Sequence, residues 1–297
     1  MTQTTRRMFL ASTAAALPAA AAKFTRPIGV QLYTVRSVYP KAEHATIEAI
    51  AKIGYKEVET LRMSLDSSLP LLKQFGLKPV SGHYETCFVT GNWEAWKGAF
   101  PQGKPAGIDW KSLCGTAAKA GQKYMVIPYV QPGERGKNLD FYKTFAEQLN
   151  KAGAETKAAG MQLAYHHHAF EFGELEGKRI IDVLMENTDP KLMALEMDVF
   201  WVSIAGEDPV KMLNKWKSRV ALIHLKDKDA GAPKQFSEGV PPKSFKEVGY
   251  GTLDFKAILK TAQKIGVKHF FVEQDQTSGN PIESIRMSYQ KLRSMNL

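Results

Sequence analysis

Residues 161–172, MQLAYHHHAFEF, join a short apolar run to a polar end, and residues 178–188, KRIIDVLMENT, follow with a helical pattern. The same order, an apolar run and then a helical pattern, recurs along most of the chain. Apolar runs of roughly four to eight residues bounded by turns are typical of buried parallel strands. The predicted strands are IGVQLYTV (28–35), YKEVET (55–60), LKPVSGHYE (77–85), QKYMVIPYV (122–130), MQLAYHHHAFEF (161–172), LMALEMDVFW (192–201), RVALIHLKD (219–227) and KHFFVEQD (268–275).

Helical patterns separate most of these strands, and four of them end at Gly54, Gly76, Gly160 and Gly266. Glycine readily closes a helix before the next strand. The predicted helices span 44–54, 65–76, 139–160, 178–188, 208–217, 252–266 and 282–295. Alternation of strands and helices over about 250 residues favours one α/β domain, a (β/α)8 TIM barrel, in residues 26–297.

A doubly wound open sheet is the alternative fold. Its dinucleotide-binding form carries a GxGxxG turn after the first strand, and no such turn follows residues 28–35. In the barrel, the longer loop 229–251, with its glycines and prolines, could form a lid beside the site.

The first 22 residues differ from the rest. Arg6 and Arg7 precede an apolar stretch that is too short to span a bilayer comfortably and that ends in small residues. This segment resembles a twin-arginine signal with cleavage near Ala22; an uncleaved tail is the alternative. The sequence therefore predicts export to the periplasm without stable membrane anchoring, by a route that suits proteins loaded with a metal or cofactor in the cytoplasm.

Composition excludes some classes of function. The formal net charge of +10 falls to +8 without Arg6 and Arg7, and the lysines are scattered among acidic residues, so nucleic acid is not an expected partner. Cys87 and Cys114 are too few for a disulfide framework and are predicted to be buried thiols. The expected partner is a small sugar, and homo-oligomerisation stays open.

Polar residues gather where the predicted strands end, which is where TIM barrels place their active sites. Five of the seven histidines lie at such ends. The residues at these ends are Glu59, His83, His166, His167, His168, Glu196, Asp198, His224, Lys226, Asp227, Glu273 and Asp275.

Alternate residues of a strand share a face. The pairs on one face are His166 with His168, Glu196 with Asp198, His224 with Lys226, and Glu273 with Asp275. Burying such charges unpaired costs several kcal/mol each, so they must be paired, hydrated or metal-bound. Mixed histidine and carboxylate ligands suit Mn²⁺, Co²⁺, Zn²⁺ or Fe²⁺, with Mg²⁺ as a further candidate.

Each residue taken alone has a simpler interpretation. His83 is typical of a hydrogen-bonded structural histidine, Trp201 could pack in the core, and Glu196 could be an ion-pair partner of Lys226. The hypothesis of a metal site depends on Asp198, His224 and Glu273 considered together.

The chain resembles the xylose-isomerase-like TIM barrels, usually called sugar phosphate isomerases/epimerases, over about residues 26–295. The motifs that carry the resemblance are GYKEVE, YHHHAFEF, LEMDVFWVSIAGEDPVKML, IHLKD, GYGTLDFKAIL and FVEQD. The resemblance implies a divalent metal held by Asp198, His224, Glu273 and one residue of the fifth strand. Many members have a glutamate there. The candidates in this chain are His166 first, His168 second and Glu171 third.

The resemblance also implies deprotonation beside a sugar carbonyl, with an enediolate stabilised by the metal. Glu273 is the candidate base, with His168 or His83 as its partner. Lys226 could stabilise the oxyanion. Candidate substrate-binding residues are Glu59, His83, Glu196 and Trp201.

Three products can follow from one enediolate. Reprotonation gives epimerisation or isomerisation of a non-phosphorylated sugar or keto-sugar, which is the predicted activity. Loss of a β-substituent gives a lyase or dehydratase of the inosose or 3-keto-glycoside type, which is the alternative. A non-catalytic sugar-binding protein is the alternative of another class, and a multi-metal endonuclease would need more ligands.

Overall fold

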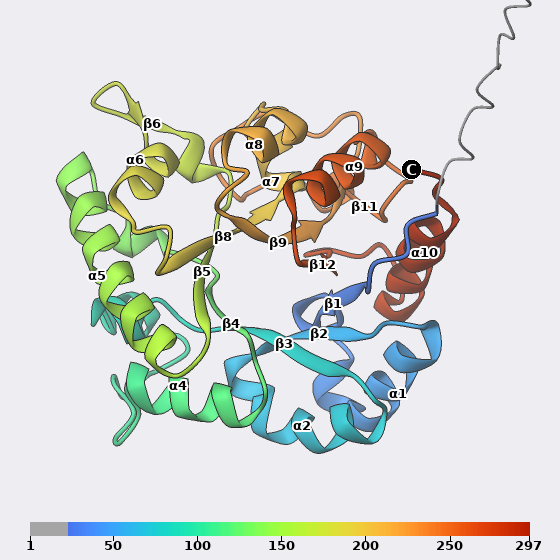
Figure 1. Cartoon of the computed structure of the whole chain (residues 1–297), viewed down its shortest axis with the longest axis horizontal. Coiled ribbons are helices and arrows are strands. Elements are labelled where there is room, and N and C mark those ends of the chain that lie inside the picture. The colour runs from blue at the N-terminus through green and yellow to red at the C-terminus, as the bar shows by residue number, and fades with distance from the viewer. Residues whose placement is uncertain (1–22) are drawn as a thin grey trace, which may run out of the picture.

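The computed structural model describes residues 23–297, which form a closed parallel barrel surrounded by helices (Figure 1). Each predicted strand supplies one strand of the barrel, so the (β/α)8 prediction is confirmed and the open-sheet alternative is wrong. The predicted leader, residues 1–22, lies outside the described residues.

The barrel strands are β1 (Gly29–Gln31), β2 (Glu57–Leu61), β3 (Lys78–His83), β4 (Tyr124–Ile127), β5 (Gln162–His166), β8 (Met193–Asp198), β9 (Val220–Leu225) and β12 (His269–Val272). They pair in parallel in this order, and β12 pairs with β1 to close the ring. Two antiparallel hairpins lie outside the barrel: β6 (Glu174–Leu175) with β7 (Lys178–Arg179), and β10 (Asp227–Lys228) with β11 (Phe245–Lys246).

The helices that cover the barrel are α1 (Glu43–Ile53), α2 (Leu65–Gln74), α4 (Trp110–Lys119), α5 (Leu139–Ala158), α6 (Ile180–Asn187), α8 (Pro209–Lys215), α9 (Phe255–Ile265) and α10 (Pro281–Ser294). Two shorter helices, α3 (Cys87–Thr90) and α7 (Val199–Ile204), follow β3 and β8. Single 3₁₀ turns span Leu32–Val35, Tyr39–Lys41, Arg62–Ser64, Glu94–Trp96, Pro132–Glu134, Phe170–Phe172 and Pro242–Ser244.

Helix α4 is absent from the sequence prediction, although its start has a clear signal. Asp109 Oδ1 accepts the backbone N–H of Ser112 at 2.8 Å, and Ser112 Oγ accepts the backbone N–H of Asp109 at 2.9 Å. This reciprocal capping satisfies two N–H groups that a helix start would otherwise leave unpaired.

The predicted glycine ends are borne out. Gly54 follows α1 with φ +119° and Gly266 follows α9 with φ +86°, a conformation that side chains with a Cβ rarely adopt. Gly76 and Gly160 lie two residues beyond the ends of α2 and α5, also with positive φ.

The packed interior of the barrel positions the site. A small apolar layer comes from six strands and consists of Val80, Val126, Ala164, Ala194, Leu222 and Phe271. Two residues further along four of these strands come His166, Glu196, His224 and Glu273. Because side chains alternate along a strand, these polar residues point to the same inner face, one layer above the apolar one.

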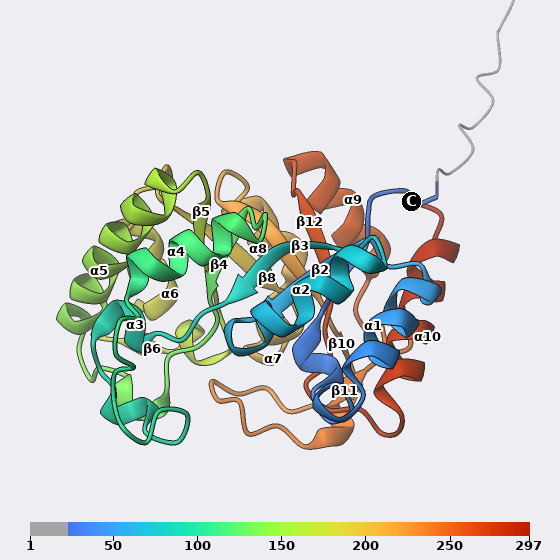
Figure 2. The same cartoon turned by 90° about the horizontal axis from the view of Figure 1, so that it is seen from below.

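Two long connections lie at the carboxyl ends of the strands. Figure 2 shows the loop 229–251, with β10 and β11, on the same lower edge as the segment after β3, while the chain end lies at the upper edge. Near that end Lys23 forms an antiparallel bridge with Asn296. Within residues 23–297, no helix is both long and apolar enough to cross a membrane.

Candidate metal centre and pocket

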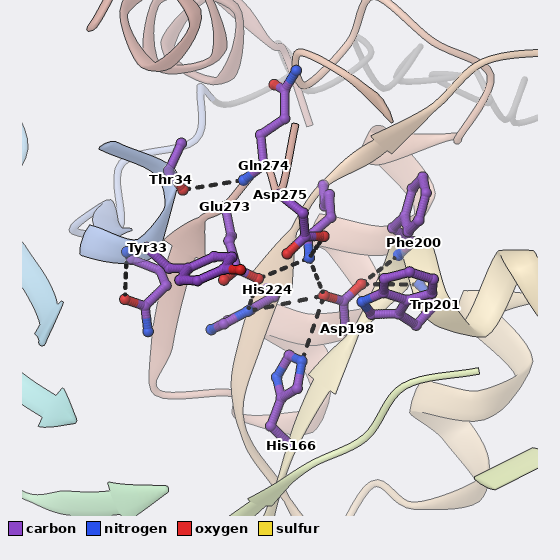
Figure 3. Close-up of polar contacts among 12 residues, drawn as sticks. Tyr33, Thr34, His166, Asp198, Phe200, Trp201, His224, Glu273, Gln274 and Asp275 are labelled. Carbon is purple, nitrogen blue, oxygen red and sulfur yellow. Dashed lines mark hydrogen bonds and ion pairs between the residues drawn. The ribbon is translucent and has the colours of Figure 1, made fainter. Parts of the chain in front are cut away.

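Four side chains at the carboxyl ends of β5, β8, β9 and β12 converge inside the barrel. We call His166, Asp198, His224 and Glu273 the outer group (Figure 3). One potential ligand atom from each lies within 4.8 Å of those of the others. His166 Nε2 lies 3.8 Å from Asp198 Oδ2, and His224 Nδ1 lies 2.8 Å from Glu273 Oε2. The structure thus brings together the four residues predicted as metal ligands.

Local structure fixes the orientation of Asp198. Its Oδ1 accepts the backbone N–H groups of Phe200 and Trp201, at 2.8 and 3.0 Å, and so caps α7. The residue between His166 and His168, His167, faces away from the pocket, where its Nε2 accepts the backbone N–H of Asp198 at 3.3 Å. The predicted strand 192–201 is therefore wrong at its end, because Asp198 ends β8 and starts a helix.

Lys226 is fully buried beside the outer group. Its Nζ lies 2.7 Å from Asp275 Oδ2, 2.8 Å from Glu273 Oε2 and 3.1 Å from Asp198 Oδ2. Burial alone would lower the pKa of Lys226, but the three carboxylates outweigh burial and hold it well above its ordinary value. Lys226 is therefore a fixed cation, and its proposed ion pair with Glu196 is wrong.

A second set of contacts lies deeper in the barrel. We call His83, His166, Glu196 and His224 the inner group, and Glu59 adjoins it. Glu196 Oε2 lies 3.2 Å from both His166 Nδ1 and His224 Nε2. Glu59 Oε1 lies 2.7 Å from His224 Nε2 and 2.9 Å from His83 Nε2.

The three candidates for the metal ligand on β5 or just beyond it differ in their contacts. His166 belongs to both groups, whereas His168 and Glu171 belong to neither. His168 lies in the pocket wall between the rings of Tyr129 and Trp201, at 4.9 and 5.2 Å between centroids. Glu171 accepts the Tyr165 hydroxyl at 2.7 Å and the His168 backbone N–H at 2.8 Å. His166 is thus the β5 residue whose geometry suits a ligand.

Burial and neighbouring charges give the histidines different protonation. Burial, with the charge of His224, holds the pKa of His166 well below its ordinary value, so His166 is neutral. Burial also lowers the pKa of His224, but Glu196, Glu273 and Glu59 outweigh it and hold that pKa well above its ordinary value. For His83, Glu59 and Glu196 outweigh burial and raise the pKa to about 9.

A pocket of about 560 Å³ opens above the outer group. His83, His166, His168, Trp201 and Glu273, all candidates from the sequence, are among its lining residues. The predicted substrate contacts of two other residues are wrong in this arrangement. Glu59 and Glu196 are fully buried under the histidines and are not among the residues that line the pocket.

Several residues in or beside the pocket were given no role from the sequence. Asp275, which strand alternation places on one face with Glu273, lines the pocket and holds Lys226. Gln31 donates from Nε2 to Glu59 Oε1 at 2.8 Å, but no sequence signal marks it. Glu238, Val240, Pro242 and Phe245 come from the loop 229–251, so the prediction that this loop lies beside the site is confirmed.

The donor set fits a divalent metal. Two imidazoles and two carboxylates are ligands that Zn²⁺, Mn²⁺ and Co²⁺ accept. In addition, Asp198 Oδ2 is buried, and within residues 23–297 it accepts no hydrogen bond of good geometry, although it forms an ion pair with Lys226 Nζ at 3.1 Å. A buried carboxylate oxygen without a hydrogen bond is costly, and a divalent cation at the outer group would coordinate it.

Comparison with known proteins agrees with this architecture. A family model described as "Xylose isomerase-like TIM barrel" matches residues 47–295. The chain is 36% identical over 156 residues to inosose dehydratase of Clostridium perfringens (strain 13 / Type A), an alignment that covers 49% of this chain and 52% of that protein. The chain therefore spans about half the length of the curated relatives it matches.

Solved structures with the same fold cover almost the whole chain. A sugar phosphate isomerase/epimerase from Parabacteroides distasonis has a TM-score of 0.73 at 24% identity, over 96% of this chain and 98% of that one. The IolI protein with a bound zinc atom has a TM-score of 0.68 at 15% identity, over 91% of this chain and 99% of that one. These likenesses concern the fold. Together with the family match across residues 47–295, they show that the chain belongs to the xylose isomerase-like TIM barrel family.

Proposed function

We propose that this chain is a divalent-metal-dependent enzyme that removes a proton beside the carbonyl of a non-phosphorylated sugar or keto-sugar. The observation that carries the proposal is the convergence of two imidazoles and two carboxylates, the outer group, under an open pocket. A divalent metal bound there would supply a Lewis acid for a carbonyl oxygen.

The residues around the pocket can hold and move protons. Glu273 lines the pocket; burial raises its pKa, but Lys226 and His224 outweigh burial, so its carboxylate is ionised and can accept a proton. His168 is neutral, because burial and the charge of Lys226 hold its pKa well below its ordinary value. His83 keeps its proton up to about pH 9 and lines the same pocket. These residues provide acceptors and a donor around one bound ring.

The charges of the pocket favour a neutral substrate. Its lining contains the carboxylates of Glu85, Glu238, Glu273 and Asp275. The one arginine in that lining, Arg62, donates two hydrogen bonds to Glu85, at 2.6 and 3.1 Å. A phosphate group would therefore meet mainly negative charge, whereas sugar hydroxyls can bond to carboxylates and stack on aromatic rings such as Trp201.

The step after deprotonation has two candidates. Epimerisation or isomerisation is the activity expected from the sequence. Elimination of water is the second candidate, favoured by the identity with an inosose dehydratase over about half the chain. Both begin with the same proton removal, so the products separate them.

The test combines metal analysis with proton exchange. Wild-type protein is expected to bind one Mn²⁺, Co²⁺ or Zn²⁺ and to exchange solvent deuterium into a carbon beside a carbonyl, in a panel of sugars, inososes and 3-keto-glycosides. Glu273→Gln should lower the exchange rate by about 100-fold or more, since general base catalysis contributes about 10²–10⁴. An enone absorbance during turnover would identify elimination. Sugar binding without exchange or turnover would make the protein a sugar-binding module.

We further propose export through the twin-arginine route. The support is the Arg6–Arg7 pair with the apolar stretch that follows it. Replacing both arginines by lysine should retain the protein in the cytoplasmic fraction, and an unchanged distribution between cytoplasm and periplasm would contradict export by this route.

A further inference from the structure

The two groups of candidate ligands share His166 and His224 but use different atoms of each ring. His166 turns Nε2 toward Asp198, at 3.8 Å from Oδ2, and Nδ1 toward Glu196, at 3.2 Å from Oε2. His224 turns Nδ1 toward Glu273, at 2.8 Å, and Nε2 toward Glu59, at 2.7 Å. Each imidazole therefore has one nitrogen in the outer group and one in the inner group.

A carboxylate oxygen carries no hydrogen, so a ring nitrogen that bonds to it must donate an N–H. A neutral imidazole has a single N–H. Without a metal, His224 donates N–H groups to both Glu273 and Glu59. If a metal takes the place of the proton on Nδ1 of His224, while Glu59 keeps the N–H at Nε2 and Glu196 keeps that of His166, the lone pairs lie on Nε2 of His166 and Nδ1 of His224. Both lone pairs then face Asp198 and Glu273.

The same atoms argue against a second metal in the inner group. A metal there and another in the outer group would require both nitrogens of two histidines as ligands, and hence two imidazolate bridges at once. Glu59 Oε1 also already accepts the Gln31 side-chain N–H at 2.8 Å. The contacts of Glu196 with His166 and of Glu59 with His224 join buried side chains, and a hydrogen bond to a charged group there holds its partner firmly.

We propose that Glu196 and Glu59 are positioning residues that hold the N–H of His166 and His224, so that the opposite nitrogens bind the metal. This inference rests on the proposed function, because it assumes a metal at the outer group. It gives Glu59 and Glu196 a task that does not require contact with the substrate. Loss of a residue that hydrogen-bonds to a metal ligand, without binding the metal itself, typically costs about 10–100-fold in metal affinity.

The experiment uses Glu196→Gln and Glu59→Gln, with Glu134→Gln as the matched control. Glu134 is also buried, but it accepts hydrogen bonds from Trp96 and Thr90, away from both groups. Dissociation constants for Zn²⁺ and Co²⁺ are measured by competition with a chromophoric chelator, and the visible spectrum of bound Co²⁺ is recorded. Circular dichroism of the metal-free proteins checks that each variant is folded.

Glu196→Gln and Glu59→Gln are each expected to bind one metal per chain about 10–100-fold more weakly than the wild type. The Co²⁺ spectrum should keep its band positions, because the ligands themselves are unchanged, and Glu134→Gln should match the wild type. Unchanged affinity in both variants, or two metals per wild-type chain, would overturn the inference while leaving the proposed function intact. Absence of metal binding in the wild type would overturn both.

A measurement on the wild type needs no variant. Nitrogen-15 chemical shifts of the histidine rings distinguish the Nδ1–H from the Nε2–H tautomer. His166 should carry its proton on Nδ1 in the Zn²⁺-loaded protein, and a proton on Nε2 would contradict the proposal.

Discussion

Trp201 donates its backbone N–H to Asp198 Oδ1 at 3.0 Å, while the other oxygen of the same carboxylate faces the outer group. Asp198 thus caps a helix and is a candidate metal ligand at once. Asp198→Asn keeps an oxygen for the cap but loses the anionic ligand; Asp198→Ala loses both. Metal affinity should fall in both variants. The fall should exceed the roughly 10–100-fold loss that follows when a residue that only hydrogen-bonds to a metal ligand is removed.

The two variants should differ in stability without metal. Loss of an N-cap costs about 1 kcal/mol, so metal-free Asp198→Ala should unfold more easily than Asp198→Asn by about that amount. Urea denaturation followed by circular dichroism measures the difference. Equal stabilities would show that α7 does not depend on this cap.

Glu171 should make the stability of the fold depend on pH. Burial raises its pKa from 4.5 to about 8, although hydrogen bonds from Tyr165 and His168 oppose the rise. Because the folded state holds this proton more tightly than the unfolded state, the stabilisation is complete below about pH 4.5 and is lost as pH rises through about 8. Glu171→Gln should therefore flatten the fall in unfolding free energy over this range.

Urea titrations between pH 5 and 8.5 measure this slope. The control is Glu186→Gln, which changes an exposed glutamate on α6. A wild-type slope that Glu171→Gln leaves unchanged would show that Glu171 is ionised in the folded protein.

The ion pair of Arg135 and Glu238 should restrain the loop 229–251. Arg135 Nη2 lies 2.9 Å from Glu238 Oε1, and its guanidinium lies 3.6 Å from the centre of the Phe170 ring. Partly exposed pairs contribute roughly 0.2–1 kcal/mol, so Glu238→Gln should raise hydrogen exchange in this loop by at most about fivefold. Exchange in the barrel strands should not change.

Mass spectrometry after deuterium labelling gives the loop and the strands separately. Glu94→Gln is the matched control, since it breaks an exposed pair with Lys97 outside the loop. Equal exchange in residues 229–251 of Glu238→Gln and wild type would mean that the pair does not hold the loop.

Asp227 should stabilise the end of this loop and the residues next to it. Its Oδ1 accepts the backbone N–H groups of Lys228 and Leu253, at 2.7 and 3.1 Å, and its Oδ2 accepts those of Gly249 and Gly251, at 2.8 and 2.9 Å. Asp227→Asn turns one acceptor into a donor that faces two other donors. The cost should be about 3 kcal/mol in unfolding free energy, measured by urea denaturation.

Asp254→Asn is the control for this substitution. Asp254 Oδ1 caps α9 by accepting the Ala257 backbone N–H at 3.0 Å, and asparagine caps equally well, so the change should be close to zero. A loss below about 1 kcal/mol in Asp227→Asn would contradict the assigned role.

Strand alternation explains why the fold and the outer group could be predicted. Each barrel strand is a local apolar run, and period-two alternation turns His166, Asp198 and Glu273 to one face without any knowledge of long-range contacts. Neighbouring parallel strands then bring these side chains together. The pairing of β8 with β9, for example, sets Asp198 beside His224.

The inner contacts depend on distances that no local pattern contains. Glu59 and His224 are 165 residues apart, and their contact depends on side chains crossing the barrel interior. The sequence placed Glu59 and Glu196 at strand ends, but it could not show that histidines would cover them and keep them from the pocket. The depth of a side chain in a barrel is set by the stagger of the strands, which the sequence pattern leaves open.

The ends of the described chain lie next to each other, with Phe24 donating its backbone N–H to Met295 at 3.3 Å, and Figure 2 places them on the edge opposite the loop 229–251. A purification tag or a fused partner attached at either end would therefore emerge away from the pocket. The same closeness makes the protein a good subject for circular permutation: residues 297 and 23 can be joined by a short linker, and new ends can be opened in a surface turn such as the one at Gly160, with every strand of the ring retained.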